Sequence, residues 1–169
     1  MRVKIILSAA IIAGLLACGL AKQSEPAVDS VTLTPERREA RLPFDRQVWQ
    51  NSPPLLEVPV SRVKNPHLTG FAIFVYLAWT PDQPGPKARQ KVSIGNFGVF
   101  PPDRPGRFTL RASQAFAEAR KRGVTLRENR PELLFVMRKV RASEAWTPLE
   151  VTLGPVTWRR ENQTEGKQQ

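Results

Sequence analysis

The sequence predicts an all-β protein, an antiparallel β-sandwich or open barrel of about seven to eight strands with one short helix, after an N-terminal signal peptide. Short apolar segments alternate with clusters of Pro, Gly and Asn, which is the pattern of strands and turns. Sixteen Pro and ten Gly among 169 residues argue against long helices. Four Trp, eight Phe and a hydrophobic fraction of 41% are enough for a core, which argues against a wholly disordered chain.

The first 17 residues have the pattern of a signal peptide. Arg2 and Lys4 give a positive start, and residues 5–17 form an uncharged, mostly apolar run. This run of 13 residues is shorter than the roughly 20 that a membrane-spanning helix needs. We therefore expect residues 1–17 to be removed on export.

The end of that run, Leu-Leu-Ala-Cys at residues 15–18, resembles the lipobox of bacterial lipoproteins. The resemblance implies that Cys18 becomes the first mature residue and is acylated on its sulfur. The alternative is ordinary cleavage after Ala21. Cys18 is the only cysteine, so the mature domain has no disulfide. Residues 18–30 are polar and are expected to form a flexible tether.

The mature chain carries a large positive charge. The whole chain has 26 basic and 15 acidic side chains, and residues 1–17 hold two of the basic ones and no acidic one, which leaves +9. For an exported protein, this charge indicates an anionic lipid surface or an acidic protein as partner, and no nucleic acid. A basic surface that is simply solvated is nevertheless a more common case than any specific binding site.

The first part of the domain predicts three strands. Residues 31–34 and 40–44 flank the charged turn 35–39, which suggests a β-hairpin. Apolar residues then alternate over 56–60. Pro59 cannot donate a hydrogen bond to a neighbouring strand, so it predicts an edge strand or a bulge at this point.

The next two strands are the most apolar. Residues 71–79 are apolar at odd and even positions alike, which predicts the central strand, covered on both faces. The loop 81–86 is too rich in proline to belong to a sheet. Within residues 92–100 the apolar positions change parity at Gly95-Asn96, where a β-bulge is expected.

One helix is expected after a short strand at residues 107–111. Ser113 is a candidate cap, and Gly123 is expected to end the helix. The apolar face, which should pack on the sheet, consists of Ala112, Ala115, Phe116 and Ala119.

Residues 133–140 and 149–158 supply the last strands, so that one β-sandwich domain spans 31–158. The polar segment 159–169 is expected to be a disordered tail. The predicted central core cluster consists of Phe71, Ile73, Val75, Leu77, Phe97 and Phe116.

No catalytic, cofactor or metal site is predicted. His67 is the only histidine and lies in a turn, where a solvated side chain is the common case. Zinc, copper and iron sites draw several ligands from His and Cys, and this chain has one of each. No Gly-x-Ser-x-Gly turn supports a hydrolase. Aromatic ligand platforms are less common than core packing for the four tryptophans, Trp49, Trp79, Trp146 and Trp158.

Several segments, in this order, resemble a known domain. They are 70–77 (GFAIFVYL), 92–100 (VSIGNFGVF), 107–111 (RFTLR) with the helix after it, 133–137 (LLFVM) and 149–153 (LEVTL). Together they resemble the C-terminal β-sandwich domain of bacterial tyrosinases and, more remotely, of plant polyphenol oxidases, over about residues 30–158.

This resemblance implies the fold and a covering or stabilising role towards a type-3 copper oxidase. It carries over no catalytic residue, because the family's catalytic part, with two histidine triads that hold a copper pair, is missing here. In the family the domain follows that catalytic part, whereas here it follows a signal peptide.

Three hypotheses result. The first is a non-catalytic module, anchored in the cell envelope by lipid at Cys18 and facing the periplasm or the exterior, that assists an exported copper oxidase. The second is a structural envelope lipoprotein without any link to an oxidase. The third, a small hydrolase, is disfavoured by the single histidine.

Overall fold

The computed structural model describes residues 30–43, 46–81, 89–141 and 145–160. The predicted signal peptide and Cys18 lie outside the described residues, as does the predicted tether up to residue 29. Of the predicted tail, only Arg159 and Arg160 are described, and Arg159 belongs to a strand.

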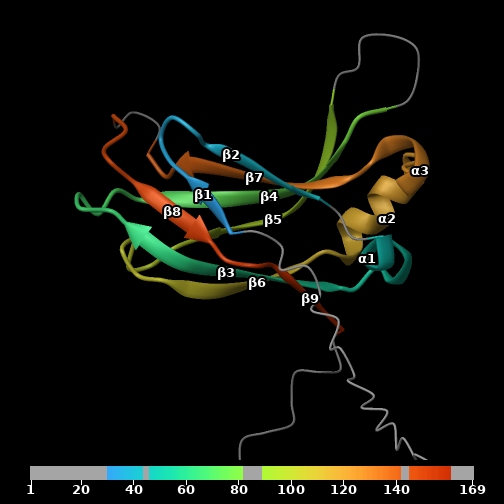
Figure 1. The fold of residues 1–169 in the computed structure, drawn as a ribbon, viewed down its shortest axis with the longest axis horizontal. Coiled ribbons are helices and arrows are strands. Elements are labelled where there is room, and N and C mark those ends of the chain that lie inside the picture. Colours follow the sequence, from blue (N-terminus) through green and yellow to red (C-terminus); the bar gives the residue numbers. More distant parts are fainter. Residues whose placement is uncertain (1–29, 44–45, 82–88, 142–144, 161–169) are drawn as a thin grey trace, which may run out of the picture.

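Two antiparallel sheets pack face to face, which confirms the predicted all-β sandwich (Figure 1). The described residues hold nine strands and three short helices, so two helices were not predicted. In chain order the elements are β1 (Val31–Leu33), β2 (Glu39–Pro43), α1 (Arg46–Asn51), β3 (Leu55–Lys64), β4 (Phe71–Trp79), β5 (Gln90–Gly98), β6 (Gly106–Arg111), α2 (Ser113–Lys121), α3 (Leu126–Asn129), β7 (Glu132–Lys139), β8 (Glu150–Leu153) and β9 (Thr157–Arg159).

The strands divide between what we call sheet A and sheet B. Sheet A has the order β1-β8-β3-β6, with β9 also paired to β3, and sheet B has the order β2-β7-β4-β5. The predicted hairpin of β1 and β2 is therefore wrong, because β1 pairs with β8 and β2 with β7. The turn 34–38 crosses from one sheet to the other, a gap of about 10 Å. Leu33 and Ala40 are both buried, one from each sheet.

Strand β3 is an interior strand in spite of Pro59. The expectation of an edge strand is wrong, but the bulge is found, since the register against β8 shifts between Val60 and Arg62. The carbonyl of Pro59 accepts a hydrogen bond from the Gly154 amide at 2.8 Å. A Cβ on Gly154 would lie 3.2 Å from the ring of Pro59, so glycine at this position lets the two backbone segments approach closely.

Strand β4 is an interior strand of sheet B, as predicted, between β7 and β5. Its coverage on both faces is found only in part, because Ala78 is buried on the outer face with Leu134 and Val136, whereas Phe74 and Tyr76 on that face are half-buried. The Arg138 guanidinium lies 4.9 Å from the ring centroid of Phe74, and the Lys91 ammonium lies 4.5 Å from that of Tyr76. These two cationic side chains thus shield part of the outer face of β4 from solvent, in place of a second layer of secondary structure.

The bulge in β5 lies one residue before its expected place. The pairing with β4 jumps from Gly95 to Ser93, which leaves Ile94 as the extra residue. A Cβ on Gly95 would lie 3.2 Å from Leu110 of β6. The glycine therefore lets β5 and β6 approach closely at the side where the two sheets meet.

Helix α2 has the predicted extent but a different cap. Ala112 is the N-cap residue and makes no side-chain hydrogen bond, so the expectation of a cap at Ser113 is wrong. The Ala112 amide is instead held by the carbonyl of Pro54 at 2.7 Å. Gly123 ends the helix as predicted, with a φ of +76° that suits glycine.

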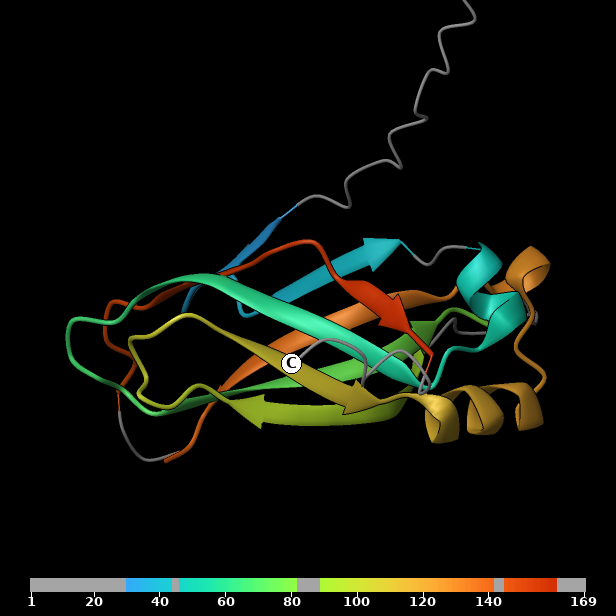
Figure 2. The same cartoon turned by 90° about the horizontal axis from the view of Figure 1, so that it is seen from below.

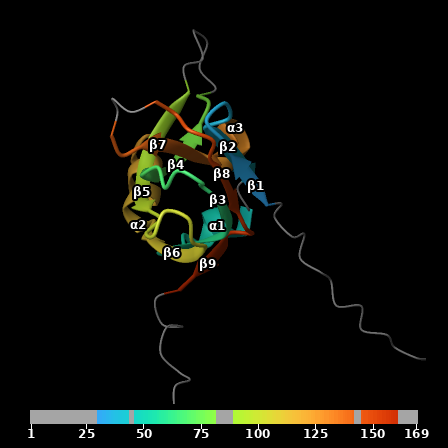
Figure 3. The same ribbon diagram turned by 90° about the vertical axis from the view of Figure 1, so that its left-hand side faces the viewer.

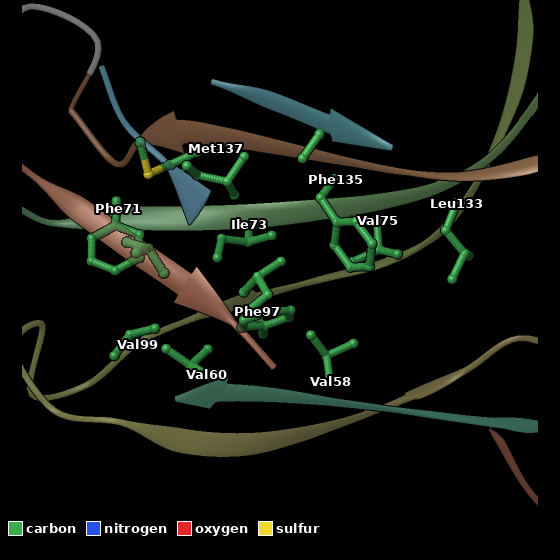
Figure 4. Close-up of a cluster of buried hydrophobic side chains, with 14 of the residues drawn as sticks. Val58, Val60, Phe71, Ile73, Val75, Phe97, Val99, Leu133, Phe135 and Met137 are labelled. Carbon is green, nitrogen blue, oxygen red and sulfur yellow. The ribbon is translucent and has the colours of Figure 1, made fainter. Parts of the chain in front are cut away.

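The predicted core residues are all buried, but they belong to two clusters rather than one. The larger cluster fills the space between the sheets and includes Phe71, Ile73, Val75 and Phe97 (Figure 4). The smaller cluster lies at the helix end of the sandwich and contains Trp49, Leu77, Trp79, Ala112, Phe116, Ala119 and Val124.

Candidate functional site at the loop end

Four chain turns meet at one end of the sandwich, opposite the helices (Figures 1 and 3). We call this end the loop end. Its described residues are 34–38, 65–70, 99–105, 140–141 and 145–149. It is the end where strands β1, β3, β5 and β7 finish and β2, β4, β6 and β8 begin.

Two buried side chains, Asn65 and Thr69, fasten three of these turns together. The Asn65 side chain donates hydrogen bonds to the carbonyls of Thr69 and Pro102, both at 2.9 Å, and accepts one from the Thr69 amide at 3.0 Å. The hydroxyls of Thr69 and Thr147 are hydrogen-bonded to each other. Asn65 and Thr69 are buried, so these bonds are protected from water and give the loop end a defined shape.

Apolar side chains are presented on this fixed frame. Phe100 is 92% exposed, Val140 67% and Leu68 59%, and these are the exposed large hydrophobic side chains of the described residues. The Val140 amide donates to the carbonyl of Gly70 at 3.0 Å, which ties the turn after β7 to the turn before β4. Leu68 has a φ of +50°, a left-handed conformation that costs about 1–3 kcal/mol for a non-glycine residue.

An open groove of about 580 Å³ adjoins these turns, with Trp146 in its wall. The Lys139 ammonium lies 5.6 Å from the Trp146 ring centroid. Lys64 and Glu150, which also line the groove, form an ion pair at 2.8 Å. The hydrogen bond from Lys64, followed by the charges of Lys64 and Arg62, outweighs desolvation and holds the pKa of Glu150 below its usual value.

His67, the single histidine, lies exposed on the loop end. Within the described residues no group of three or more His, Cys, Asp or Glu is placed to hold a metal ion. His67 is therefore not part of such a group among the described residues.

The four tryptophans divide between core and surface. Trp49 and Trp79 are buried in the helix-end cluster, and Trp158 packs against it. Trp146 is half-buried at the groove, where it packs on the edge of the larger cluster. The structure thus agrees with core packing for the first three and leaves Trp146 as a surface aromatic.

Sequence reasoning missed the exposed apolar residues of the loop end. It assigned Phe100 to a strand, because residue type alone does not show exposure. The one available signal was the proline pair that follows Phe100, which ends the strand and starts a turn. Cys18, the predicted lipidation site, lies outside the described residues. Among those residues, no helix is long and apolar enough to span a bilayer.

The fold and the loop end together define an antiparallel β-sandwich that presents an apolar loop surface. No family model matches the chain, and no curated protein matches it. The resemblance to the tyrosinase C-terminal domain therefore remains a prediction from the sequence.

Proposed function

We propose that this protein is a non-catalytic module of the cell envelope, anchored by lipid at Cys18, that binds an exported protein through its loop end. The observation that carries the proposal is the exposure of Phe100, at 92%, on a frame held by buried hydrogen bonds. Exposed apolar side chains that gather on one face of a soluble domain are typical of interaction surfaces. A rigid frame lowers the entropy that is lost when such a surface binds.

The partner we propose is an exported type-3 copper oxidase. Support comes from the order of the apolar segments, which resembles the tyrosinase C-terminal domain over about residues 30–158. In this proposal the module covers or stabilises the oxidase and takes no part in its chemistry.

The test is the affinity of the chain for the exported copper oxidase of the same host, measured by calorimetry with purified proteins. We expect Phe100→Ser to weaken binding by roughly 30-fold or more, the effect of removing an interface hot spot. Lys121→Ala, at the far end of α2, is the matched control and should leave affinity unchanged. Absence of binding, or equal affinity of Phe100→Ser and the unmodified chain, would contradict the proposal and favour a structural lipoprotein.

A further inference from the structure

The outer face of sheet A is strongly basic, and we call it the basic face. It contains five basic residues and two acidic ones, a net charge of +3. The basic residues are Arg62, Lys64, Arg107, Arg111 and Arg159, and the acidic ones are Glu57 and Glu150. Figure 2 shows the sandwich from the side of this sheet.

A buried carboxylate fixes two of the arginines in place. Glu57, whose side chain is 9% exposed, accepts a hydrogen bond from Arg107 on β6 at 2.9 Å and forms an ion pair with Arg159 on β9, also at 2.9 Å. The two guanidinium groups themselves remain well exposed. One carboxylate neutralises only one of the two cations, so the pair presents a net positive charge with its remaining N–H donors towards solvent.

The rest of this face is mostly polar, with Leu55 and Pro59 half-buried among the charged side chains. Lys64 pairs with Glu150 across β3 and β8, and Arg62 lies close enough to affect the same carboxylate. Threonine hydroxyls fill the neighbouring outward positions, including the hydrogen-bonded pair Thr32 and Thr152. The exposed large hydrophobic residues of the described chain all lie at the loop end instead. The basic face is therefore suited to electrostatic contact with a charged surface and not to apolar insertion.

The chain that precedes β1 indicates that the charged surface nearest to sheet A is the membrane. Strand β1 belongs to sheet A and is the first described strand, so the segment that leads back to Cys18 joins this sheet. The 13 residue steps from Cys18 to Val31 span at most about 45 Å when extended. If Cys18 is anchored in a membrane, as proposed above, the bilayer stays within this reach, and a weak electrostatic contact is strengthened by tethering.

We propose that the basic face of sheet A binds anionic phospholipid headgroups and lays the sandwich flat on the membrane. This inference rests on the proposed lipid anchor. It leaves the loop end, which lies along the long axis of the domain, free to meet a protein partner.

The test uses the lipid-anchored chain, purified from its host and reconstituted in vesicles. One set of vesicles contains phosphatidylcholine alone, and the other contains phosphatidylglycerol as well. Modification of individual arginines by phenylglyoxal is followed by mass spectrometry. We expect Arg62 and Arg107 to react about fivefold more slowly on the anionic vesicles, as about 1 kcal/mol per basic residue near the surface implies. Salt at about 0.5 M should abolish the difference through screening.

Arg138, which is exposed on the outer face of sheet B, is the internal control and should react equally on both kinds of vesicle. Equal reaction of Arg62 on both kinds of vesicle would overturn the inference while leaving the anchor intact. Restoration of the rate by millimolar inorganic phosphate would show a site for free phosphate and would also overturn it. A chain that carries no lipid and washes off the vesicles would contradict the proposed anchor instead.

Discussion

The ring of Phe116 on α2 meets the indole of Trp49 on α1 edge-on, with centroids 5.8 Å apart and planes inclined by 61°. Trp158 of β9 approaches the same phenyl ring at 5.5 Å. Phe116 therefore joins two helices and a C-terminal strand that are far apart in the sequence. Trp49 and Phe116 are members of the helix-end cluster, and Trp158 packs against it.

Replacing Phe116 with Ala should destabilise the domain by about 3–5 kcal/mol, because a buried phenyl ring is lost and a cavity remains. In a thermal melt this corresponds to a fall in Tm of roughly 10–20 °C. Trp146→Ala is the comparison, since Trp146 is half-buried and should cost less. Equal, small effects of the two substitutions would mean that α2 is not packed as described.

Asn65→Ala should loosen the loop end. The substitution removes three hydrogen bonds and leaves the buried Thr69 amide without its acceptor, a cost on the order of 2 kcal/mol. Hydrogen exchange at the amides of Leu68 and Arg104 should accelerate by about 30-fold. Ser61→Ala, which removes one exposed hydrogen bond, is the control. Unchanged exchange at Leu68 in Asn65→Ala would contradict this account.

The ion pair of Lys64 and Glu150 should make stability depend on acid pH. The hydrogen bond from Lys64 lowers the folded-state pKa of Glu150. The ionised carboxylate therefore adds to the free energy of unfolding at a pH above the unfolded-state pKa of 4.5, and this stabilisation is lost as the pH falls through the folded-state pKa. In Lys64→Met the pKa of Glu150 should rise towards 4.5, as measured by NMR titration of the carboxyl carbon. An unaltered pKa in that variant would show that Lys64 is not the cause.

The mature chain should begin at Cys18 and carry acyl groups, as the lipobox-like segment implies. Two acyl chains anchor a protein stably, whereas a single one gives marginal binding. Mass spectrometry of the exported protein should show the lipidated cysteine, and Cys18→Ala should release the protein from the membrane fraction. A mature N-terminus at Lys22 would instead establish cleavage after Ala21.

The sandwich was predictable because apolar runs and turn residues are local features. Strand β4 and Gly123 behave as the pattern indicates, since an all-apolar run favours the interior of a sheet and glycine tolerates positive φ. Strand pairing was not predictable in the same way. The turn 34–38 looks like a hairpin turn, but whether two strands pair or face each other across the core depends on contacts that are distant in the sequence.

The loop end shows the same limit. Asn65, next to Pro66, reads as an ordinary turn residue, and only the folded chain shows that its amide reaches Pro102 on another turn. Likewise, Phe100 follows a strand of alternating apolar residues, and its exposure depends on where the strand stops. Pro59 predicted an edge strand or a bulge, and the bulge is found, but in an interior strand, because the carbonyl of Pro59 can still accept a hydrogen bond from Gly154.

The pairing of β1 with β8 also bears on how the protein is made. Thr32 and Thr152 are hydrogen-bonded across a sequence separation of 120 residues, so sheet A cannot be completed until almost the whole chain has been synthesised. Contacts of such long range slow folding, because a large loop must close before they form. If the chain is exported unfolded, as the signal-peptide pattern predicts, such a delay would favour its passage across the membrane. Strand β1 stays without its partner until β8 has been synthesised.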